Sequence, residues 1–115
     1  MNQKKVYMAG AVKGLPYPQV LAKFSAKSEE LQDKGFIVYN PVLAVRNENL
    51  RREVARKKMP PLNDEETRDE TMRFCIGLLL ECDELHLLPC WQDSQGARLE
   101  RDIAMRLNIP IVYPS

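Results

Sequence analysis

A glutamate lies in the middle of the apolar face of the last predicted helix, and the fold has to accommodate it. At about 100° per residue, residues 94–107 place five apolar side chains on one arc with Glu100 among them: Ala97, Leu99, Ile103, Ala104 and Leu107. The opposite arc is charged. A buried carboxylate is costly unless it is paired, hydrated or used chemically. Glu100 therefore has either a structural partner, such as an arginine or a tyrosine, or a function.

Short apolar segments alternate with helical patterns along the chain. The expected strands are residues 5–9, 36–39, 84–88 and 109–113, and the expected helices include residues 17–33 and 94–107. Nearly continuous apolar runs are typical of parallel strands that are covered on both faces. A chain of 115 residues is long enough for one sizeable core. We therefore predict one α/β domain over residues 1–115, with an open parallel sheet of about four or five strands flanked by helices.

Two helices are expected in the middle of the chain. Asn63 followed by Glu66 matches a capping box, so a helix is expected to begin there. Its predicted apolar face is Met72, Cys75, Ile76, Leu79 and Leu80, and Asp69 continues that face by one turn. Residues 47–58 are expected to form a polar and basic helix. It is interpreted either as a solvated surface or as a lid or anion-steering element.

Composition argues against several classes of protein. The net charge of +1 is far from that of a dedicated nucleic-acid binder, so no nucleic-acid polymer is expected as a partner. Three cysteines without a CxxC pair, together with a single histidine, argue against a disulfide framework and a zinc site. No metal and no organic cofactor is expected. Without a signal-peptide pattern or a long apolar run, we expect a cytoplasmic protein that does not bind a membrane.

Three irregular loops are expected to meet at one edge of the sheet. In an open parallel sheet the ligand binds at the carboxyl ends of the strands, which residues 10–18, 40–46 and 89–96 follow here. These loops contribute Lys13, Asn40, Trp91, Asp93 and Ser94. Lys13 is either an anion ligand or a surface lysine. Trp91 either stacks on a base or fills the edge of the core.

Ser94 is expected to cap the last helix, with Gly96 just inside it. The free N–H groups of such a helix start suit an anion such as phosphate. The alternative is a serine that only caps the helix. Glu100 lies six residues further, about 9 Å along the helix axis. A carboxylate placed there, beneath a phosphate-bound ligand, is suited to attack an anomeric carbon or to stabilise an oxocarbenium ion.

The sequence resembles the nucleoside 2-deoxyribosyltransferase superfamily over residues 6–113. Residues 6–16, Val-Tyr-Met-Ala-Gly-Ala-Val-Lys-Gly-Leu-Pro, are similar to the family's opening. Residues 94–100, Ser-Gln-Gly-Ala-Arg-Leu-Glu, resemble its second signature. The resemblance is strongest to a small branch found in bacteria and phages, which is similar to the 2′-deoxynucleoside 5′-monophosphate N-hydrolases. It implies a flavodoxin-like or Rossmann-like fold and a homodimer or larger homo-oligomer.

The resemblance also implies roles for individual residues. Glu100 matches the catalytic nucleophile that attacks C1′ of the deoxyribose, and Ser94 matches the serine that binds phosphate in the hydrolases. Lys13 stands where the hydrolases have an arginine for the phosphate, and Tyr7 and Gly10 fall on the first-strand motif. The transferases that act on unphosphorylated nucleosides carry an aspartate in place of Ser94.

One position departs from this pattern. The hydrolases carry an aspartate, used towards the base, eight residues before the aspartate that matches Asp83, and this chain has Cys75 there. A thiol is a poor proton donor near neutral pH. Asp69 and Asp93 are the candidate catalytic substitutes. Ala11 also replaces a serine of the hydrolases.

These observations predict a function in nucleotide metabolism. The leading hypothesis is an enzyme that cleaves or transfers the N-glycosidic bond of a (deoxy)nucleoside 5′-monophosphate, which is its small-molecule partner. One alternative is a nucleotide-binding or sensing protein that keeps the pocket without the chemistry. The other is a deoxyribosyltransferase that acts on free nucleosides, against which Ser94 counts.

Overall fold

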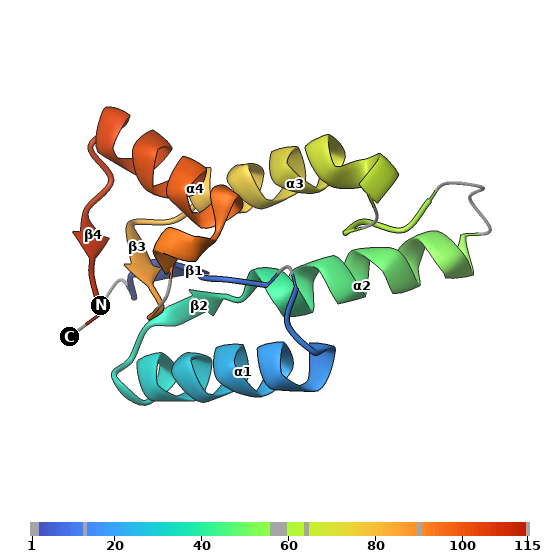
Figure 1. Cartoon of the computed structure of the whole chain (residues 1–115). Coiled ribbons are helices and arrows are strands. Elements are labelled where there is room, and N and C mark those ends of the chain that lie inside the picture. The colour runs from blue at the N-terminus through green and yellow to red at the C-terminus, as the bar shows by residue number, and fades with distance from the viewer. Residues whose placement is uncertain (1–2, 13, 56–59, 64, 90, 115) are drawn as a thin grey trace.

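Four parallel strands form the centre of the computed structural model, which describes residues 3–12, 14–55, 60–63, 65–89 and 91–114 (Figure 1). The strands are β1 (Lys5–Ala9), β2 (Ile37–Tyr39), β3 (Glu84–Leu87) and β4 (Ile111–Val112), in the order β2-β1-β3-β4. Every pairing is parallel, and Tyr7 of the central β1 is in register with Tyr39 on one side and Leu85 on the other. This confirms the predicted α/β domain with an open parallel sheet.

Helices cover both faces of this sheet. Helix α1 (Tyr17–Asp33) lies on one face, and α3 (Arg68–Leu80) and α4 (Gln95–Arg106) lie on the other (Figure 1). Side chains of β1 alternate between the two layers. Val6 and Met8 pack with the α1 side, whereas Tyr7 and Ala9 belong to the core beneath α3 and α4. The phenol of Tyr7 therefore lies under the last two helices.

The sequence predicted α1 with its observed bounds. Four of its residues are buried at helical spacing: Val20, Phe24, Ser28 and Leu31. Gly35 follows the helix with a φ of 93°, a left-handed conformation that glycine adopts without strain. None of the described helices is both long and apolar enough to cross a bilayer.

The structure corrects the prediction for residues 40–58. Residues 41–46, predicted as part of a loop, form the first turns of α2 (Pro41–Val54). The Oδ1 atom of Asn40 accepts hydrogen bonds from the backbone N–H groups of Val42 and Leu43, at 3.1 and 3.4 Å. Asn40 is thus the N-cap, and the fixed φ of Pro41 suits the first helical position. Val54 is the last residue of α2, and residues 56–58 of the predicted helix lie outside the described residues.

The predicted start of the next helix is also wrong. Helix α3 begins at Arg68, after a short 3₁₀ turn, η1 (Glu65–Thr67). Asn63 has a φ of 74°, whereas an N-cap residue needs an extended backbone, and its N–H donates to Oγ1 of Thr71. Cys75 and Leu79 are buried as predicted, but Asp69 and Leu80 are exposed.

Helix α4 buries a narrower stripe than the apolar pattern indicated. Ala97, Glu100 and Ala104 face the sheet, while Leu99 and Leu107 are about half exposed. Helix α3 packs beside α4, while the flanks of the apolar arc of α4 stay exposed (Figure 1). Glu100 is nevertheless at the centre of the buried stripe, as predicted.

Candidate active site

Three side chains from three elements meet beneath α3 and α4: Tyr7 of β1, Cys75 of α3 and Glu100 of α4. The Tyr7 hydroxyl donates a hydrogen bond to the Glu100 carboxylate, and the Cys75 thiol lies beside the same hydroxyl. All three residues are buried, with exposed fractions of 1%, 8% and 6% respectively. We call these residues the buried acid cluster.

The electrostatics of Glu100 are unusual for a carboxylate. Burial raises the pKa of its carboxyl to about 7, and the hydrogen bond from Tyr7 opposes that rise. No ion pair joins Glu100 to a cationic residue in the described part of the chain. Its Oε2 atom is buried and has no hydrogen-bond partner among these residues. Of the two partners expected for a structural glutamate, a tyrosine is thus present, but it satisfies only one oxygen.

Cys75 lies beside Glu100 as a neutral thiol. Burial, together with the negative charge of Glu100, raises the pKa of Cys75 to about 12. The same two causes raise the pKa of Tyr7 well above its usual value. Cys75 therefore remains protonated at neutral pH and is neither a reactive thiolate nor an effective proton donor.

The start of α4 has the expected cap. Ser94 has an extended backbone, and its Oγ atom accepts the N–H of Ala97 at 3.1 Å. The N–H groups of Gln95 and Gly96 precede the first intrahelical bonds, so they are free to receive an anion. A Cβ atom on Gly96 would lie 3.1 Å from Sδ of Met72, which places that α3 side chain over the helix start.

The structure leaves no room for a side chain at Gly10. It follows β1, and a Cβ atom there would lie only 3.0 Å from the Cβ of Leu88, after β3. The ends of the two strands approach closely because the Leu88 N–H donates to the carbonyl of Ala9 at 2.8 Å. Lys13, which the sequence assigned to the same loop as an anion ligand, lies outside the described residues.

The two candidate acids are not part of the buried acid cluster. Asp69 lies in the first turn of α3, and Asp93 ends the 3₁₀ turn η2 (Trp91–Asp93) immediately before Ser94. Both are exposed, and no hydrogen bond or ion pair joins either of them to another described residue. Their proposed role as acids stays a prediction.

Trp91 is packed into the edge of the core. It is buried, the guanidinium carbon of Arg101 lies 5.1 Å from its ring centroid, and the ring of Tyr113 lies 5.9 Å away. This packing matches the core alternative, and stacking on a base stays a prediction. His86 is also buried, and its Nε2 atom lies 3.0 Å from Oε1 of Glu84.

Two surface hollows occur elsewhere. One is lined by the end of α4 and β4, and the other lies at the free edge of β2, and neither includes a member of the buried acid cluster. Glu100 is itself only 6% exposed, so a ligand that reaches its carboxylate must displace side chains that cover it. Within the described ranges, no group of histidine, cysteine and carboxylate side chains is arranged to hold a metal ion.

Sequence reasoning did not pair Tyr7 with Glu100 or with Cys75. It assigned Tyr7 to the pocket only through the first-strand motif. The pairing could have been predicted from two patterns: the alternation of side chains along β1 and the buried face of α3. Together they place Tyr7 and Cys75 on the side of the sheet that Glu100 faces. Met72 was expected only as a core residue.

Comparison with known proteins identifies a family but no activity. The family model described as "Domain of unknown function (DUF4406)" matches residues 4–113. No curated protein shows a significant match to the sequence.

Proposed function

We propose that this chain, which belongs to the family described as a domain of unknown function (DUF4406), is an N-glycosidase acting on (deoxy)nucleoside 5′-monophosphates. It would cleave the N-glycosidic bond or transfer the sugar to a second base. The likeness of residues 6–16 and 94–100 to the nucleoside 2-deoxyribosyltransferase superfamily, and to its nucleotide hydrolases, suggests this class of substrate.

The observation that carries the proposal is the unpartnered Oε2 atom of Glu100. An unsatisfied buried acceptor destabilises a protein by about 1–3 kcal/mol, and more when it is charged. Glu100 has one hydrogen-bonding partner in the cluster, Tyr7, and no counter-cation among the described residues. A carboxylate oxygen left without a partner is suited to bond to a ligand. The start of α4 lies about 9 Å away along the helix axis, a separation that suits a phosphate at one end and C1′ at the other.

The proposed reaction has two steps. Oε2 of Glu100 attacks C1′, the bond from C1′ to the base nitrogen breaks, and its electron pair leaves with the base, which takes up a proton. Water, or a second base in a transfer, then attacks C1′ of the glycosyl ester and releases Glu100. Tyr7 holds the other oxygen through its hydrogen bond. The free N–H groups at the start of α4 would bind the phosphate.

The proton that the leaving base takes up has three candidate sources. Cys75 occupies the position of the hydrolases' aspartate, but its pKa of about 12 makes it unsuitable. Asp93 precedes Ser94 directly and Asp69 lies at the start of α3, so either carboxyl, or solvent, would supply the proton.

The thiol of Cys75 also favours a second candidate function. A protein that binds a nucleotide as a sensor needs the helix start and the pocket but no acid. The buried acid cluster, with its neutral thiol and covered carboxylate, is compatible with binding alone.

The test is an incubation with a panel of deoxynucleoside and ribonucleoside 5′-monophosphates, with the matching nucleosides, followed by chromatography for free base. We expect the wild type to release base from at least one monophosphate. Glu100→Gln should lose at least about 1,000-fold in rate, because amide oxygen is a poor nucleophile. The exposed Glu81→Gln is the matched control and should leave the rate unchanged.

Other outcomes separate the alternatives. Nucleotide binding by calorimetry without base release, and unaffected by Glu100→Gln, would establish the sensor. Base exchange without a requirement for phosphate would establish the nucleoside transferase. Neither binding nor release by the wild type would overturn all three functions.

A substitution at Cys75 tests whether the acid limits the rate. Cys75→Asp supplies a carboxyl where the similar hydrolases have aspartate, and base release should rise at least about tenfold if protonation of the base is slow. Cys75→Ser, with no such carboxyl, is the control. An increase with serine as well would show that packing rather than protonation is responsible.

A further inference from the structure

The outward face of α2 carries a stripe of residues at coiled-coil spacing. Leu43, Asn47, Leu50 and Val54 follow one another at intervals of four, three and four residues, so they lie within a narrow arc of the helix. All four are exposed, and Val54 is 84% exposed. We call these four residues the α2 seam. Alternating steps of three and four residues are the pattern of positions a and d in a heptad repeat.

We propose that the α2 seam pairs with the same seam of a second copy of this chain, with the two helices antiparallel. A two-fold axis between Glu48 and Asn49 then brings Leu43 against the partner's Val54 and Asn47 against the partner's Leu50. All four seam positions are used, and each contact occurs twice by symmetry. The inference does not depend on the proposed activity.

Charges beside the seam favour the antiparallel arrangement. Arg46 and Glu53 occupy positions that flank it, both are exposed, and neither forms an ion pair with another described residue. In the antiparallel pair Arg46 faces the partner's Glu53, twice. In a parallel pair Arg46 would instead face the partner's Arg51, and two like-charge contacts would oppose association.

The surface around the start of α2 also suits this partner. Leu43 and Asn47 form part of the wall of a hollow of about 230 Å³, completed by α1, Leu78 of α3 and the edge of β2. Strand β2 ends the sheet order, so one of its edges is unpaired. The antiparallel arrangement brings the partner's Val54 end of α2 to this hollow. A partner helix would thereby cover an edge strand that is otherwise open to unspecific pairing.

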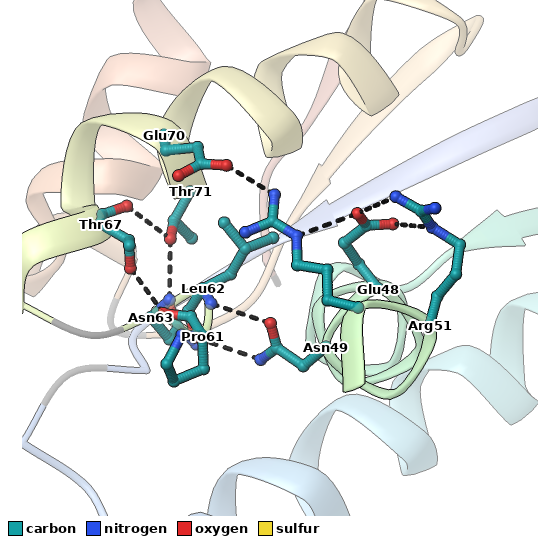
Figure 2. A network of polar contacts seen from close by, with 10 residues as sticks. Glu48, Asn49, Arg51, Pro61, Leu62, Asn63, Thr67, Glu70 and Thr71 are labelled. Atoms are coloured by element: carbon teal, nitrogen blue, oxygen red, sulfur yellow. Dashed lines mark hydrogen bonds and ion pairs between the residues drawn. The ribbon is translucent and has the colours of Figure 1, made fainter. Parts of the chain in front are cut away.

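Helix α2 is already held in place before any partner binds. The side chain of Asn49 exchanges two hydrogen bonds with the backbone of Leu62 (Figure 2). Arg52 forms ion pairs with Glu48 and with Glu70 of α3. Val42 and Val45 are buried in the core. Association therefore orders little additional chain. The seam is only about 16 Å long, so we expect a reversible dimer with a micromolar dissociation constant.

The test is sedimentation velocity on the full chain from about 1 to 300 µM. We expect a monomer–dimer equilibrium that Leu50→Glu weakens at least about tenfold, because it places a carboxylate in both central layers of the seam, against the partner's Asn47. Leu80→Glu is the matched control, since Leu80 is an equally exposed leucine at the end of α3. Circular dichroism verifies that both variants are folded. A wild type that stays monomeric, or a dimer lost only with Leu80→Glu, would overturn the proposal.

A charge exchange tests the orientation. Arg46→Glu should weaken the dimer, since it opposes two glutamates across the seam, and adding Glu53→Arg should restore it. A parallel dimer predicts the opposite sign, because Arg46→Glu would relieve repulsion with the partner's Arg51. Stronger association of the single variant would therefore refute the antiparallel arrangement.

Discussion

The Tyr7 hydroxyl, on the central strand, donates a hydrogen bond to the carboxylate of Glu100, on the last helix. This bond crosses the core layer that α3 and α4 cover. It satisfies one carboxylate oxygen and leaves Oε2 without a partner among the described residues. Glu100 is thereby oriented but not neutralised, and its protonation depends on pH in the physiological range.

Glu100 should make the stability of the protein depend on pH. Its pKa of about 7 in the folded state lies above the ordinary value of 4.5, so the folded state binds the proton more tightly than the unfolded state. The stabilisation is complete below pH 4.5 and is lost as pH rises through 7. The free energy of unfolding should therefore fall by about 3 kcal/mol between these values.

Glu100→Gln tests this linkage, since the amide does not titrate. Urea unfolding should find the variant more stable than the wild type at pH 8, by up to about 3 kcal/mol, and nearly equal to it at pH 4. The exposed Glu81→Gln should show no such difference. A gap between Glu100→Gln and the wild type that is the same at both pH values would contradict the raised pKa.

Tyr7→Phe should raise the pKa of Glu100 further. The hydrogen bond from Tyr7 lowers that pKa, so its loss leaves burial unopposed. Carbon-detected NMR of glutamate-labelled protein would follow the titration, and Tyr39→Phe, on the neighbouring strand, is the control. The variant should also lose about 1–3 kcal/mol of stability, more at pH 8 than at pH 5. An unchanged titration midpoint would show that the bond does not act on the charged form.

Gly10→Ala should destabilise the fold, because the added Cβ would lie 3.0 Å from the Cβ of Leu88 in a buried position. We expect a loss of about 1–3 kcal/mol in the free energy of unfolding. Gly77→Ala is the matched control. It lies within α3 with no atom near the new methyl group, so it should gain about 0.5–1 kcal/mol. Equal effects of the two substitutions would contradict the close approach at Gly10.

Asn49→Ala should lower the free energy of unfolding, because it removes the hydrogen bonds between α2 and the segment that leads to α3. The Asn49 side chain accepts the N–H of Leu62 at 2.8 Å and donates to its carbonyl at 3.2 Å (Figure 2). Its removal leaves two backbone groups of a buried residue without partners, at a cost of about 2–4 kcal/mol. Urea unfolding measures the loss, and Gln19→Ala, on the exposed face of α1, is the control. A loss below that of the control would show that water replaces the amide.

Local sequence rules located some helix ends and misplaced others. The bounds predicted for α1, residues 17–33, are those observed, and its buried residues Val20, Phe24 and Leu31 follow helical spacing. The pair Asn40-Pro41 is compatible both with the end of a strand and with an N-cap followed by a proline at the first helical position. The structure has the second. Asn63 and Glu66 matched a capping box, but the left-handed backbone of Asn63 excludes that role.

The sequence by itself determined that Glu100 faces the interior and that Ser94 caps its helix. Each of these properties depends on residues close together in the chain. Only the tertiary structure decided which side chains meet Glu100, because strand pairing and helix packing bring Tyr7 and Cys75 to it from distant segments. A helical wheel identifies the buried face of a helix but not the atoms opposite that face. It therefore could not show that a tyrosine satisfies one oxygen of Glu100 and leaves the other free.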